Sequence, residues 1–279
     1  GNHNLDAGTA AALYTLDLYA EEGMRTFGGG RDAAEARQPL LVTHNGNRLA
    51  FLGYNQFGPK YAWARADRPG AARFSLEAVQ AEIAEDGGSA SVHPCDIRDE
   101  VAVGATIDAV LQLRGRIDGL VNNAGGQYRT AMKTISTKGF EAVVRNNLTG
   151  GFIFMREVYL RWMEAHGGAI VNIIADMWHG WPDYAHSGAA RAGMHNLSET
   201  AACEWAASGV RVNTVAPGGI ASSGFDTYSP EAKAKILQYP PTVPLQRYGT
   251  ESELSAAIVF LLSPAAAYIT GSCIRVDGG

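Results

Sequence analysis

The chain has 279 residues, 46% of them hydrophobic and 18% charged, which suits a globular protein with one large domain or two small ones. Its net charge of −5 argues against a nucleic acid or an anionic membrane as a partner, and no apolar run reaches the roughly 18 residues that a membrane span needs. Because the sequence begins without a signal-peptide pattern and its three cysteines lie far apart, we expect a cytoplasmic protein without a disulfide framework or a cysteine metal site.

The first 84 residues contain a helix pattern and a hairpin pattern but no regular alternation of elements. Residues 6–23 have the spacing of an amphipathic helix. Residues 39–54 place Asn45-Gly46 between two apolar runs, which is a strong short-range signal for a β-hairpin. Residues 55–75 are rich in Gly and Pro and predict a loop or a short strand.

From residue 85 onward, strand and helix patterns alternate. The apolar runs predict strands at 89–97, 117–126, 169–174, 210–219 and 272–279. Helical spacing predicts helices at 99–115, 140–168, 187–209 and 251–264. Because the strand segments are β-branched runs that do not alternate with polar residues, we predict an α/β protein whose parallel sheet has helices on both faces.

The sequence NNAGG, residues 122–126, stands at the end of one expected buried strand. Ligands of parallel sheets bind beyond the carboxyl ends of the strands. Glycines there let a cofactor approach the backbone, and asparagine side chains tie down the neighbouring loops. Taken alone, the motif is also compatible with a plain strand-to-helix turn.

Six motifs in order link residues 85–279 to one family. They are CDI (95–97), NNAG (122–125), RNNLTG (145–150), AIVNI (169–173), RVNTVAPGGI (211–220) and ITGSCIRVDGG (269–279). In this order and spacing they resemble the short-chain dehydrogenase/reductase family. More narrowly, the branch of peroxisomal trans-2-enoyl-CoA reductases and citronellol/citronellal-type dehydrogenases is resembled by GGQY (125–128), ISTKGF (135–140), HGGAIVNII (166–174), HSGAARAG (186–193) and FLLSPAAAYITG (260–271). The resemblance implies a Rossmann-like sheet, an NAD or NADP cofactor, a small-molecule substrate, and a homodimer or homotetramer.

The same resemblance implies positions around the cofactor. Asp96 corresponds to a residue beside the adenine ring. The loop beside the adenine ribose corresponds to Asn122, Ala124 and Gly125. The loop that holds the nicotinamide carboxamide corresponds to Pro217, Gly218, Ile220 and Ser222. Asn147 corresponds to a helix asparagine that holds a proton-relay water, and the alternative is a polar side chain that faces solvent.

The acid–base residues depart from the family pattern. Most members use a serine, a tyrosine and a lysine, and the lysine lowers the pKa of the tyrosine. Here the serine position falls near Ile174 or Ala175, and the other two fall at Ser187 and Arg191. A serine hydroxyl is a far weaker acid than a phenol, whereas Arg191 can still bind the nicotinamide ribose one helical turn from Ser187. The enoyl-CoA reductase branch shares this departure, and alkene reduction beside a thioester can depend on polarisation of the carbonyl.

Other acidic or basic side chains stand close to Ser187 in the sequence. They are Asp176, His179, Tyr184, His186 and His195. Tyr184 and His186 are the nearest candidates for a substitute acid, and a surface or packing role is the alternative for each.

The first half lacks the Thr-Gly-x-x-x-Gly-x-Gly loop that presents backbone N–H groups to the cofactor pyrophosphate. The nearest imitation is 41–50, which has Thr43 in place but His44 where the first glycine belongs, and it is better explained by the hairpin. Residues 1–75 resemble instead the capsule and poly-gamma-glutamate biosynthesis family, which is metallophosphoesterase-like and carries an Asn-His pair where this chain has Asn2-His3. We therefore predict an N-terminal segment, 1–84, that replaces the first βαβ unit of a core at 85–279, whether by natural fusion, engineering or an assembly artefact.

Three functions follow from these patterns. The first is an oxidoreductase that transfers a hydride between NAD(P) and an enoyl-CoA or a terpenoid or long-chain alcohol or aldehyde. The second is a non-catalytic Rossmann-like remnant that does not bind nucleotide. The third is a metal-dependent phosphoesterase that uses Asn2, His3 and Asp6, although these residues do not make a complete metal site.

Overall fold

The computed structural model describes residues 88–221 and 242–279 continuously, together with shorter pieces of the N-terminal part. These pieces are 13–14, 17, 21, 29–32, 40–44, 47–51, 70–71, 80–81 and 83–84. The chain divides into two compact units, one made of 1–92 and 220–252, and the other of 93–219 and 253–279. Among the described residues, no helix is both long and apolar enough to cross a bilayer.

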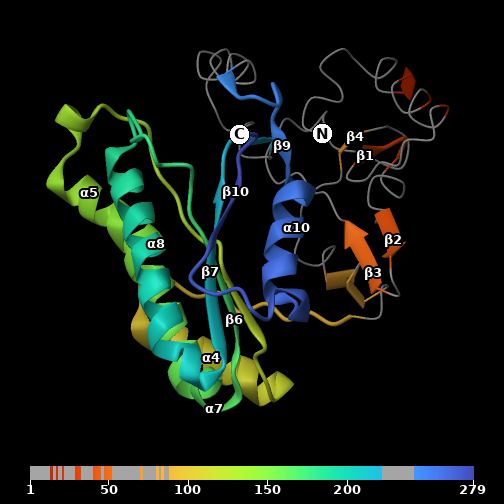
Figure 1. Cartoon of the computed structure of the whole chain (residues 1–279), viewed down its shortest axis with the longest axis vertical. Helices are drawn as coiled ribbons and strands as arrows, with labels where there is room; N and C mark the ends of the chain where they lie inside the picture. Colours follow the sequence, from red (N-terminus) through yellow and green to blue (C-terminus); the bar gives the residue numbers. More distant parts are fainter. Residues whose placement is uncertain are drawn as a thin grey trace. The chain divides into compact units, whose positions relative to one another are not determined.

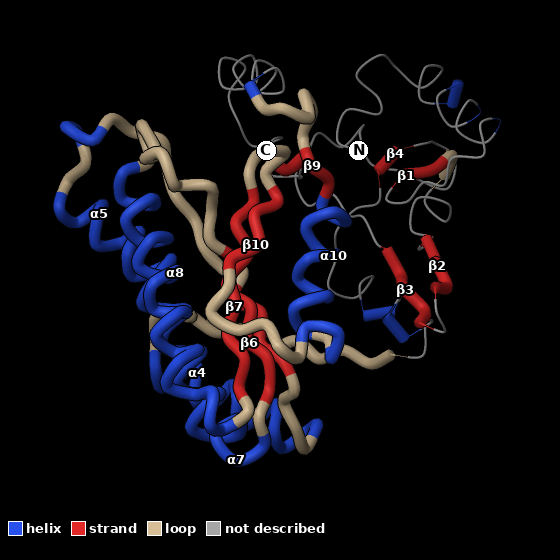
Figure 2. The backbone as a smooth tube through the Cα atoms, in the orientation of Figure 1, coloured by secondary structure: helices blue, strands red, loops and turns tan. Residues whose placement is uncertain are grey.

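The second unit contains a parallel sheet of four strands in the order β10-β7-β6-β5 (Figures 1 and 2). The strands are β5 (Gly119–Asn122), β6 (Gly168–Ile173), β7 (Val210–Pro217) and β10 (Cys273–Val276). The register places Asn122 opposite Asn172, and Asn172 opposite Thr214. The predicted parallel sheet is therefore confirmed, and the strands predicted at 117–126 and 169–174 are direct neighbours.

Helices pack on both faces of this sheet, as the strand pattern predicts. On one face, Ile170 and Ile174 join a core with α4 (Glu100–Arg114), α6 (Gly150–Val158) and α8 (Ala185–Trp205). On the other face, Val171 and Ile173 pack against α10 (Glu251–Leu262), which Figure 1 shows across the sheet from α8. Successive residues of β6 thus alternate between two apolar layers, and each fully buried Val or Ile contributes about 1.5–3 kcal/mol.

Capping residues set the helix ends that the sequence predicts. The Asp99 side chain accepts hydrogen bonds from the backbone N–H groups of Val101 and Ala102 at the start of α4, and Gly115 ends the helix with a φ of 75°. Helix α8 continues into a short 3₁₀ turn and ends at Gly209, which has a φ of 72°. Glycine favours this left-handed backbone because it has no Cβ.

The helix predicted at 140–168 is present but begins earlier and contains two π-helical turns. It starts with α5 (Thr137–Val144), where Ser136 Oγ accepts the Gly139 N–H. It continues through a π turn at Arg145–Thr149, α6, a second π turn at Tyr159–Met163 and α7 (Glu164–His166). It ends at Gly167, with a φ of 72°, as the glycine stop predicts.

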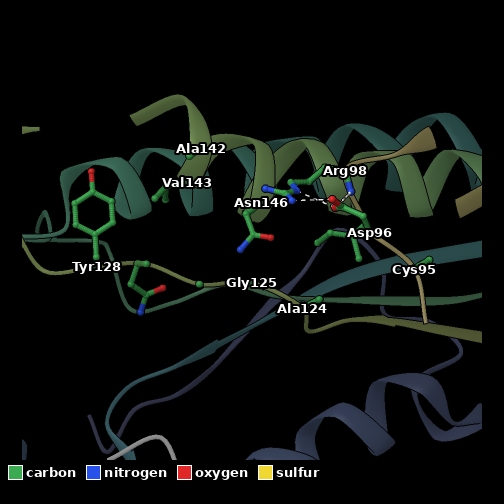
Figure 3. Close-up of a pocket in the computed structure, with 12 residues that line it drawn as sticks. Cys95, Asp96, Arg98, Ala124, Gly125, Tyr128, Ala142, Val143 and Asn146 are labelled. Carbon is green, nitrogen blue, oxygen red and sulfur yellow. Dashed lines mark hydrogen bonds and ion pairs between the residues drawn. The ribbon is translucent and has the colours of Figure 1, made fainter. Parts of the chain in front are cut away.

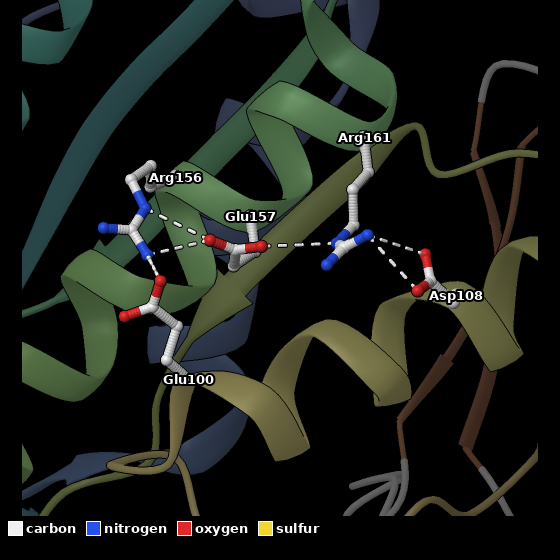
Figure 4. Close-up of polar contacts among 5 residues, drawn as sticks. All are labelled: Glu100, Asp108, Arg156, Glu157 and Arg161. Atoms are coloured by element: carbon white, nitrogen blue, oxygen red, sulfur yellow. Dashed lines mark hydrogen bonds and ion pairs between the residues drawn. The ribbon is translucent and has the colours of Figure 1, made fainter.

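A row of charges joins α4 to α6 (Figure 4). Glu157 is 8% exposed and accepts hydrogen bonds from Arg156, while its second oxygen lies 3.3 Å from Arg161 Nε. The two arginines reach across to α4, where Arg156 Nη2 donates to Glu100 at 2.5 Å and Arg161 Nη1 donates to Asp108 at 3.1 Å. The buried carboxylate is therefore held between two cations.

The first unit contains the predicted hairpin. Strands β2 (Leu40–His44) and β3 (Asn47–Phe51) pair antiparallel with His44 opposite Asn47, while the turn residues 45 and 46 lie outside the described residues. Residues 13–14, 17 and 21 are helical, in agreement with the helix predicted at 6–23. The first unit also contains two short strand pairs, β1 (Gly29–Gly30) with β4 (Gly70–Ala71) and β8 (Ile220–Ala221) with β9 (Gly249–Thr250).

The strand predicted at 89–97 is wrong. Residues 88–96 form no strand, and the chain turns at Ile97 and Arg98 into α4. A strand needs a neighbour that pairs its N–H and C=O groups, and among the described residues the parallel sheet ends at β5. None of the described N-terminal strands joins that sheet.

Candidate active site

A groove of about 690 Å³ lies beside the loop that follows β5 (Figure 3). Three segments line it: residues 95–98, the loop 124–128, and the helix residues Ala142, Val143 and Asn146. The groove therefore brings together Asp96, Ala124 and Gly125, which the sequence assigns to the adenosine side of a cofactor site.

Asp96 lies on the edge of this groove as one half of an ion pair. Its carboxylate accepts two hydrogen bonds from the Arg98 guanidinium, at 2.8 and 2.7 Å, and one from the Arg98 backbone N–H at 2.9 Å (Figure 3). These hydrogen bonds from Arg98 hold the pKa of the Asp96 carboxyl well below its usual range. Asp96 is thus a fixed negative charge at neutral pH.

Asn147 fastens the loop after β5 to the long helix. It lies in the first π turn and is 2% exposed, so the solvent-facing alternative is wrong. Its Nδ2 donates to the carbonyl oxygens of Gly126 at 2.6 Å and Val143 at 2.9 Å, and its Oδ1 accepts the Gly126 N–H at 3.1 Å. The amide therefore satisfies both backbone groups of Gly126.

Gly125 lies where the Asn147 and Arg191 side chains meet. A Cβ at this position would be 2.5 Å from Arg191 Nη2 and 2.6 Å from Asn147 Oδ1. Any side chain larger than hydrogen would displace one of the two. The glycine therefore allows a buried amide and a buried guanidinium to reach the same point of the loop.

Asn122 ties the end of β5 to its neighbours. Its Nδ2 donates to Asn172 Oδ1 on β6 at 2.8 Å and to the Gly151 carbonyl oxygen of α6 at 3.3 Å. Asn172 in turn donates to Ser198 Oγ at 2.8 Å. This agrees with the role that the sequence gives to asparagines in this motif, which is to hold the loops at the end of the sheet.

Arg191 is a buried cation. It is 9% exposed, and its Nη1 donates to the Ile173 carbonyl oxygen at 2.5 Å. None of the ion pairs between described residues involves this side chain. Burial lowers the pKa of Arg191 to about 10, so the guanidinium stays charged at pH 7. A desolvated charge of this kind favours a ligand with electronegative oxygen atoms.

Ser187 is completely buried one helical turn before Arg191. Its Oγ donates to Gln127 Oε1 at 3.4 Å, so the loop after β5 also contacts the position where the family has its tyrosine. The family's serine position is apolar here, because Ile174 and Ala175 are buried and carry no hydroxyl. The described site therefore has a hydroxyl and a cation but lacks the phenol of the family pattern.

The two nearest substitute acids differ in their surroundings. His186 is fully buried, its Nδ1 accepts the Ser187 N–H at 2.8 Å, and its ring lies edge-on to Tyr128 with centroids 4.6 Å apart. Tyr184 directly precedes α8 and is partly buried, with its ring tilted against Trp181 at 5.1 Å. Of the two, His186 is therefore joined to the groove wall, through Tyr128.

The remaining candidates from this region contact other partners. Asp176 Oδ1 lies 3.6 Å from Arg275 Nη2, which is an ion-pair distance but too long for a hydrogen bond. His195 Nδ1 lies 3.3 Å from Thr214 Oγ1, and the ring of His195 is edge-on to Trp178.

The loop assigned to the carboxamide is only partly described. The Pro217 carbonyl oxygen accepts the Asp176 N–H at 3.1 Å. The Gly218 N–H donates to Val276, and a Cβ at Gly218 would be 2.7 Å from Asp277 Cα. Ile220 belongs to β8 in the first unit, and Ser222 lies outside the described residues.

The residues of the metal hypothesis, Asn2, His3 and Asp6, also lie outside the described residues. The part of the chain that the structure describes has no group of three or more His, Cys, Asp or Glu side chains arranged for a metal ion. Thr43 and His44 lie in strand β2, so 41–50 forms the hairpin rather than a glycine-rich loop, as predicted.

Six residues that line the groove were given no role from the sequence. They are Arg98, Gln127, Tyr128, Ala142, Val143 and Asn146. Gln127 and Tyr128 directly follow the NNAGG motif, and Asn146 belongs to the RNNLTG motif. The contacts of Gln127 with Ser187 and of Tyr128 with His186 join positions about 60 residues apart, which no local pattern reveals.

Comparison with known proteins gives two family matches. The model of the family described as Enoyl-(Acyl carrier protein) reductase matches residues 71–279, and that of the bacterial capsule synthesis protein PGA_cap matches residues 1–129. The two matches overlap at 71–129.

Curated relatives include two dienoyl-CoA reductases. The peroxisomal 2,4-dienoyl-CoA reductase of Danio rerio is 37% identical over 187 residues, which cover 66% of this chain and 62% of that protein. The probable 2,4-dienoyl-CoA reductase of Bacillus subtilis is 34% identical over 208 residues, 74% of this chain and 82% of that protein. The match thus spans less than two thirds of the Danio rerio protein.

Solved structures with the same fold include two dehydrogenases. The citronellol catabolism dehydrogenase of Pseudomonas aeruginosa is 51% identical with a TM-score of 0.63, over 74% of this chain and 80% of that one. An NAD+-bound xylitol dehydrogenase is 30% identical with a TM-score of 0.67, over 73% of this chain and 84% of that one.

Proposed function

Since this chain belongs to the short-chain dehydrogenase/reductase family of oxidoreductases, we propose that it uses NADH or NADPH to reduce the activated double bond of an enoyl thioester. The observation that carries the proposal is that the site contains a buried cation, Arg191, together with a buried serine, Ser187, at the position where the family has a tyrosine. Oxidation of an alcohol needs a base for the hydroxyl proton, whereas reduction of a conjugated alkene needs polarisation of the neighbouring carbonyl.

The described residues fit the nicotinamide cofactor on the side of its ribose and adenosine. Arg191 has no carboxylate partner among the described residues, and Gly125 leaves the loop close to it without a side chain. Arg191 would hold hydroxyl oxygens of the ribose, and Asp96, Ala124 and Gly125 would line the adenosine side. The cofactor supplies a hydride when it is bound.

The chain's own residues then orient the reacting groups. Asn147 keeps Gly126 and the preceding glycine in place, so that the loop cannot close over the site. The Ser187 hydroxyl donates its hydrogen to Gln127 Oε1, so the lone pairs of its oxygen can accept a hydrogen bond from the substrate. We assign Asn147, Ser187 and Arg191 to the site, with Tyr184 and His186 as further candidates, and keep Asn122, Pro217, Gly218, Ile220 and Ser222 as cofactor-side proposals.

A second candidate is the oxidation of a terpenoid or long-chain alcohol, or the reduction of the corresponding aldehyde. The 51% identity to the citronellol catabolism dehydrogenase favours it. Ser187 argues against it, because an isolated serine hydroxyl is a poor acid and a poor base near neutral pH.

The third possibility is a chain that binds no nucleotide, because the described N-terminal strands do not supply a glycine-rich phosphate loop. Calorimetric titration with NADH and with NADPH tests it. We expect binding of one of the two, together with a rise in the melting temperature. If millimolar cofactor gives neither heat nor thermal stabilisation, the enzyme proposal is refuted.

Two assays separate the first two candidates. One measures consumption of the reduced cofactor with a trans-2-enoyl-CoA, and the other measures its production from citronellol and the oxidised cofactor.

We also propose that the chain forms a cytoplasmic homodimer or homotetramer, and that residues 1–84 form a segment of separate, capsule-family origin in front of the core at 85–279. Light scattering of the purified full chain measures the oligomeric state.

A further inference from the structure

His186 has a buried ring nitrogen that no neighbour satisfies. The side chain is 0% exposed, and its Nε2 has no hydrogen-bond partner among the described residues. Its other nitrogen, Nδ1, accepts the Ser187 backbone N–H at 2.8 Å. Because an accepting nitrogen carries no proton, the ring is neutral and its proton is on Nε2. A donor N–H is therefore buried without an acceptor, which is rare in folded proteins.

The residue beside this donor belongs to the groove. The Tyr128 and His186 rings make a T-shaped contact with their centroids 4.6 Å apart, and Tyr128 also lines the groove, where it is 44% exposed. The hydroxyl of Tyr128 lies against helix α5, because a Cβ at Gly139 would collide with it. Tyr128 therefore contacts the ring that carries the buried donor and also lines the groove, where Figure 3 shows it.

We propose that the His186 Nε2–H donates a hydrogen bond to the carbonyl oxygen of an α,β-unsaturated thioester, which reaches it when the Tyr128 ring moves aside. The inference rests on the proposed function and makes His186 a catalytic residue of that reaction. Ser187, the next residue of α8, donates its hydroxyl hydrogen to Gln127 Oε1. The site then replaces the phenol of the family pattern with the N–H donor of His186.

A neutral imidazole suits this role because it keeps its proton throughout the reaction. A hydride supplied by the bound cofactor would add to the β-carbon and break the π bond of the alkene, and the cofactor would thereby be oxidised. The displaced electron pair moves towards the carbonyl, whose oxygen becomes an enolate oxygen that accepts the His186 hydrogen bond. A proton from water then adds to the α-carbon and restores the carbonyl. A fixed donor stabilises the charge that develops on the oxygen, and neutral imidazoles act as electrophiles in this way.

The direct test is a histidine ring ¹H–¹⁵N correlation spectrum of the full chain with its oxidised cofactor. Two ligands are compared: hexanoyl-CoA, which has the thioester carbonyl, and S-hexyl-CoA, a thioether that lacks it. We expect the Nε2–H proton of His186 to shift downfield with the thioester and to stay in place with the thioether. If both ligands bind by calorimetry and the resonance moves with neither or equally with both, the inference is refuted while the proposed function survives. If neither binds, the proposed function is refuted, and the inference with it.

Two variants give an independent kinetic readout. His186→Phe removes the donor, and we expect kcat with a trans-2-enoyl-CoA to fall roughly 100-fold with little change in KM, which is the usual loss for one such donor. His186→Gln keeps an N–H donor and should restore most of that loss. Equal losses in both variants would assign His186 to packing alone.

Tyr128→Ala leaves His186 itself unchanged. If Tyr128 separates the donor from the groove, this variant speeds the exchange of the Nε2–H proton with water. An exchange rate equal to that of the unchanged chain would show that Tyr128 does not cover the donor, and would refute the proposed route to His186.

Discussion

Replacing Gly125 by alanine places a methyl group where the site has no room. The new Cβ would be 2.5 Å from Arg191 Nη2 and 2.6 Å from Asn147 Oδ1, both closer than carbon and polar atoms approach without repulsion. Neither side chain is free to move, because Arg191 donates to the Ile173 carbonyl and Asn147 makes three hydrogen bonds to backbone groups.

The expected cost follows from these contacts. Forcing one methyl group against packed, buried side chains such as these costs about 1–3 kcal/mol of the free energy of unfolding. The upper end applies if the Arg191 or Asn147 hydrogen bonds break, because a buried polar group left unsatisfied costs about 1–3 kcal/mol. For a domain of this size, each kcal/mol lowers the melting temperature by roughly 2–4 °C.

The neighbouring glycine provides the control. A Cβ at Gly126 would meet Asn146 Nδ2 at 3.4 Å, which is ordinary van der Waals contact, and neither Gly125 nor Gly126 has a positive φ. Gly126→Ala should therefore change stability by no more than about 0.5 kcal/mol. Thermal unfolding followed by circular dichroism compares the two variants. A Gly126→Ala variant as destabilised as Gly125→Ala would refute the argument that Arg191 and Asn147 fill the space beside Gly125.

Three further predictions concern charges. Arg191→Met should weaken binding of the nicotinamide cofactor more than tenfold in calorimetry, while the unfolding free energy without cofactor changes little, because the lost hydrogen bond to Ile173 is offset by removal of a buried cation. Glu157→Gln should lower the unfolding free energy by about 1–3 kcal/mol, because Arg156 and Arg161 lose a buried anion, whereas Glu100→Gln at the exposed end should cost less than about 1 kcal/mol in urea unfolding. The pKa of the Asp96 carboxyl is depressed in the folded chain, so its ionised form stabilises the fold above the ordinary carboxyl pKa of 3.8, and this stabilisation is lost as the pH falls below that value. Asp96→Asn should therefore reduce the fall in melting temperature on acidification. A melting temperature that depends on pH as in the unchanged chain would contradict this.

The sequence predicts the sheet and helices of the second unit because their determinants are local. Gly115, Gly167 and Gly209 end helices where the sequence expects them to end, since only glycine adopts those backbone angles without strain. The unalternating runs at β6 and β7 predict strands that are buried on both faces. The segment 89–97 fails for the converse reason: its local pattern is that of a strand, but pairing depends on a neighbour elsewhere in the chain.

The candidate site residues came from the family resemblance, and their contacts came only from the structure. The resemblance implied that Asn147, Ser187 and Arg191 belong to one site, and all three side chains contact the loop at 125–127. The contacts of Gln127 and Tyr128 with α8 arise only when the loop folds back over the helix. The solvent-facing alternative for Asn147 failed because the π turn directs its amide towards Gly126.

Because of that π turn, the long helix can change its length by one residue in evolution without losing its packing on the sheet, whereas its contact with the loop depends on the turn. A wider turn accommodates an additional residue without ending the helix. A deletion of one residue within 145–149 would therefore restore a regular α-helix in which the flanking halves keep their places and the residues of the turn change direction. The apolar half at α6 would remain packed on the sheet, and the amide would point away from the loop. A shortened homologue can thus lose the hydrogen bonds from Asn147 to the loop after β5 while its fold remains stable. Intact folding of such a homologue therefore does not show that its site is preserved.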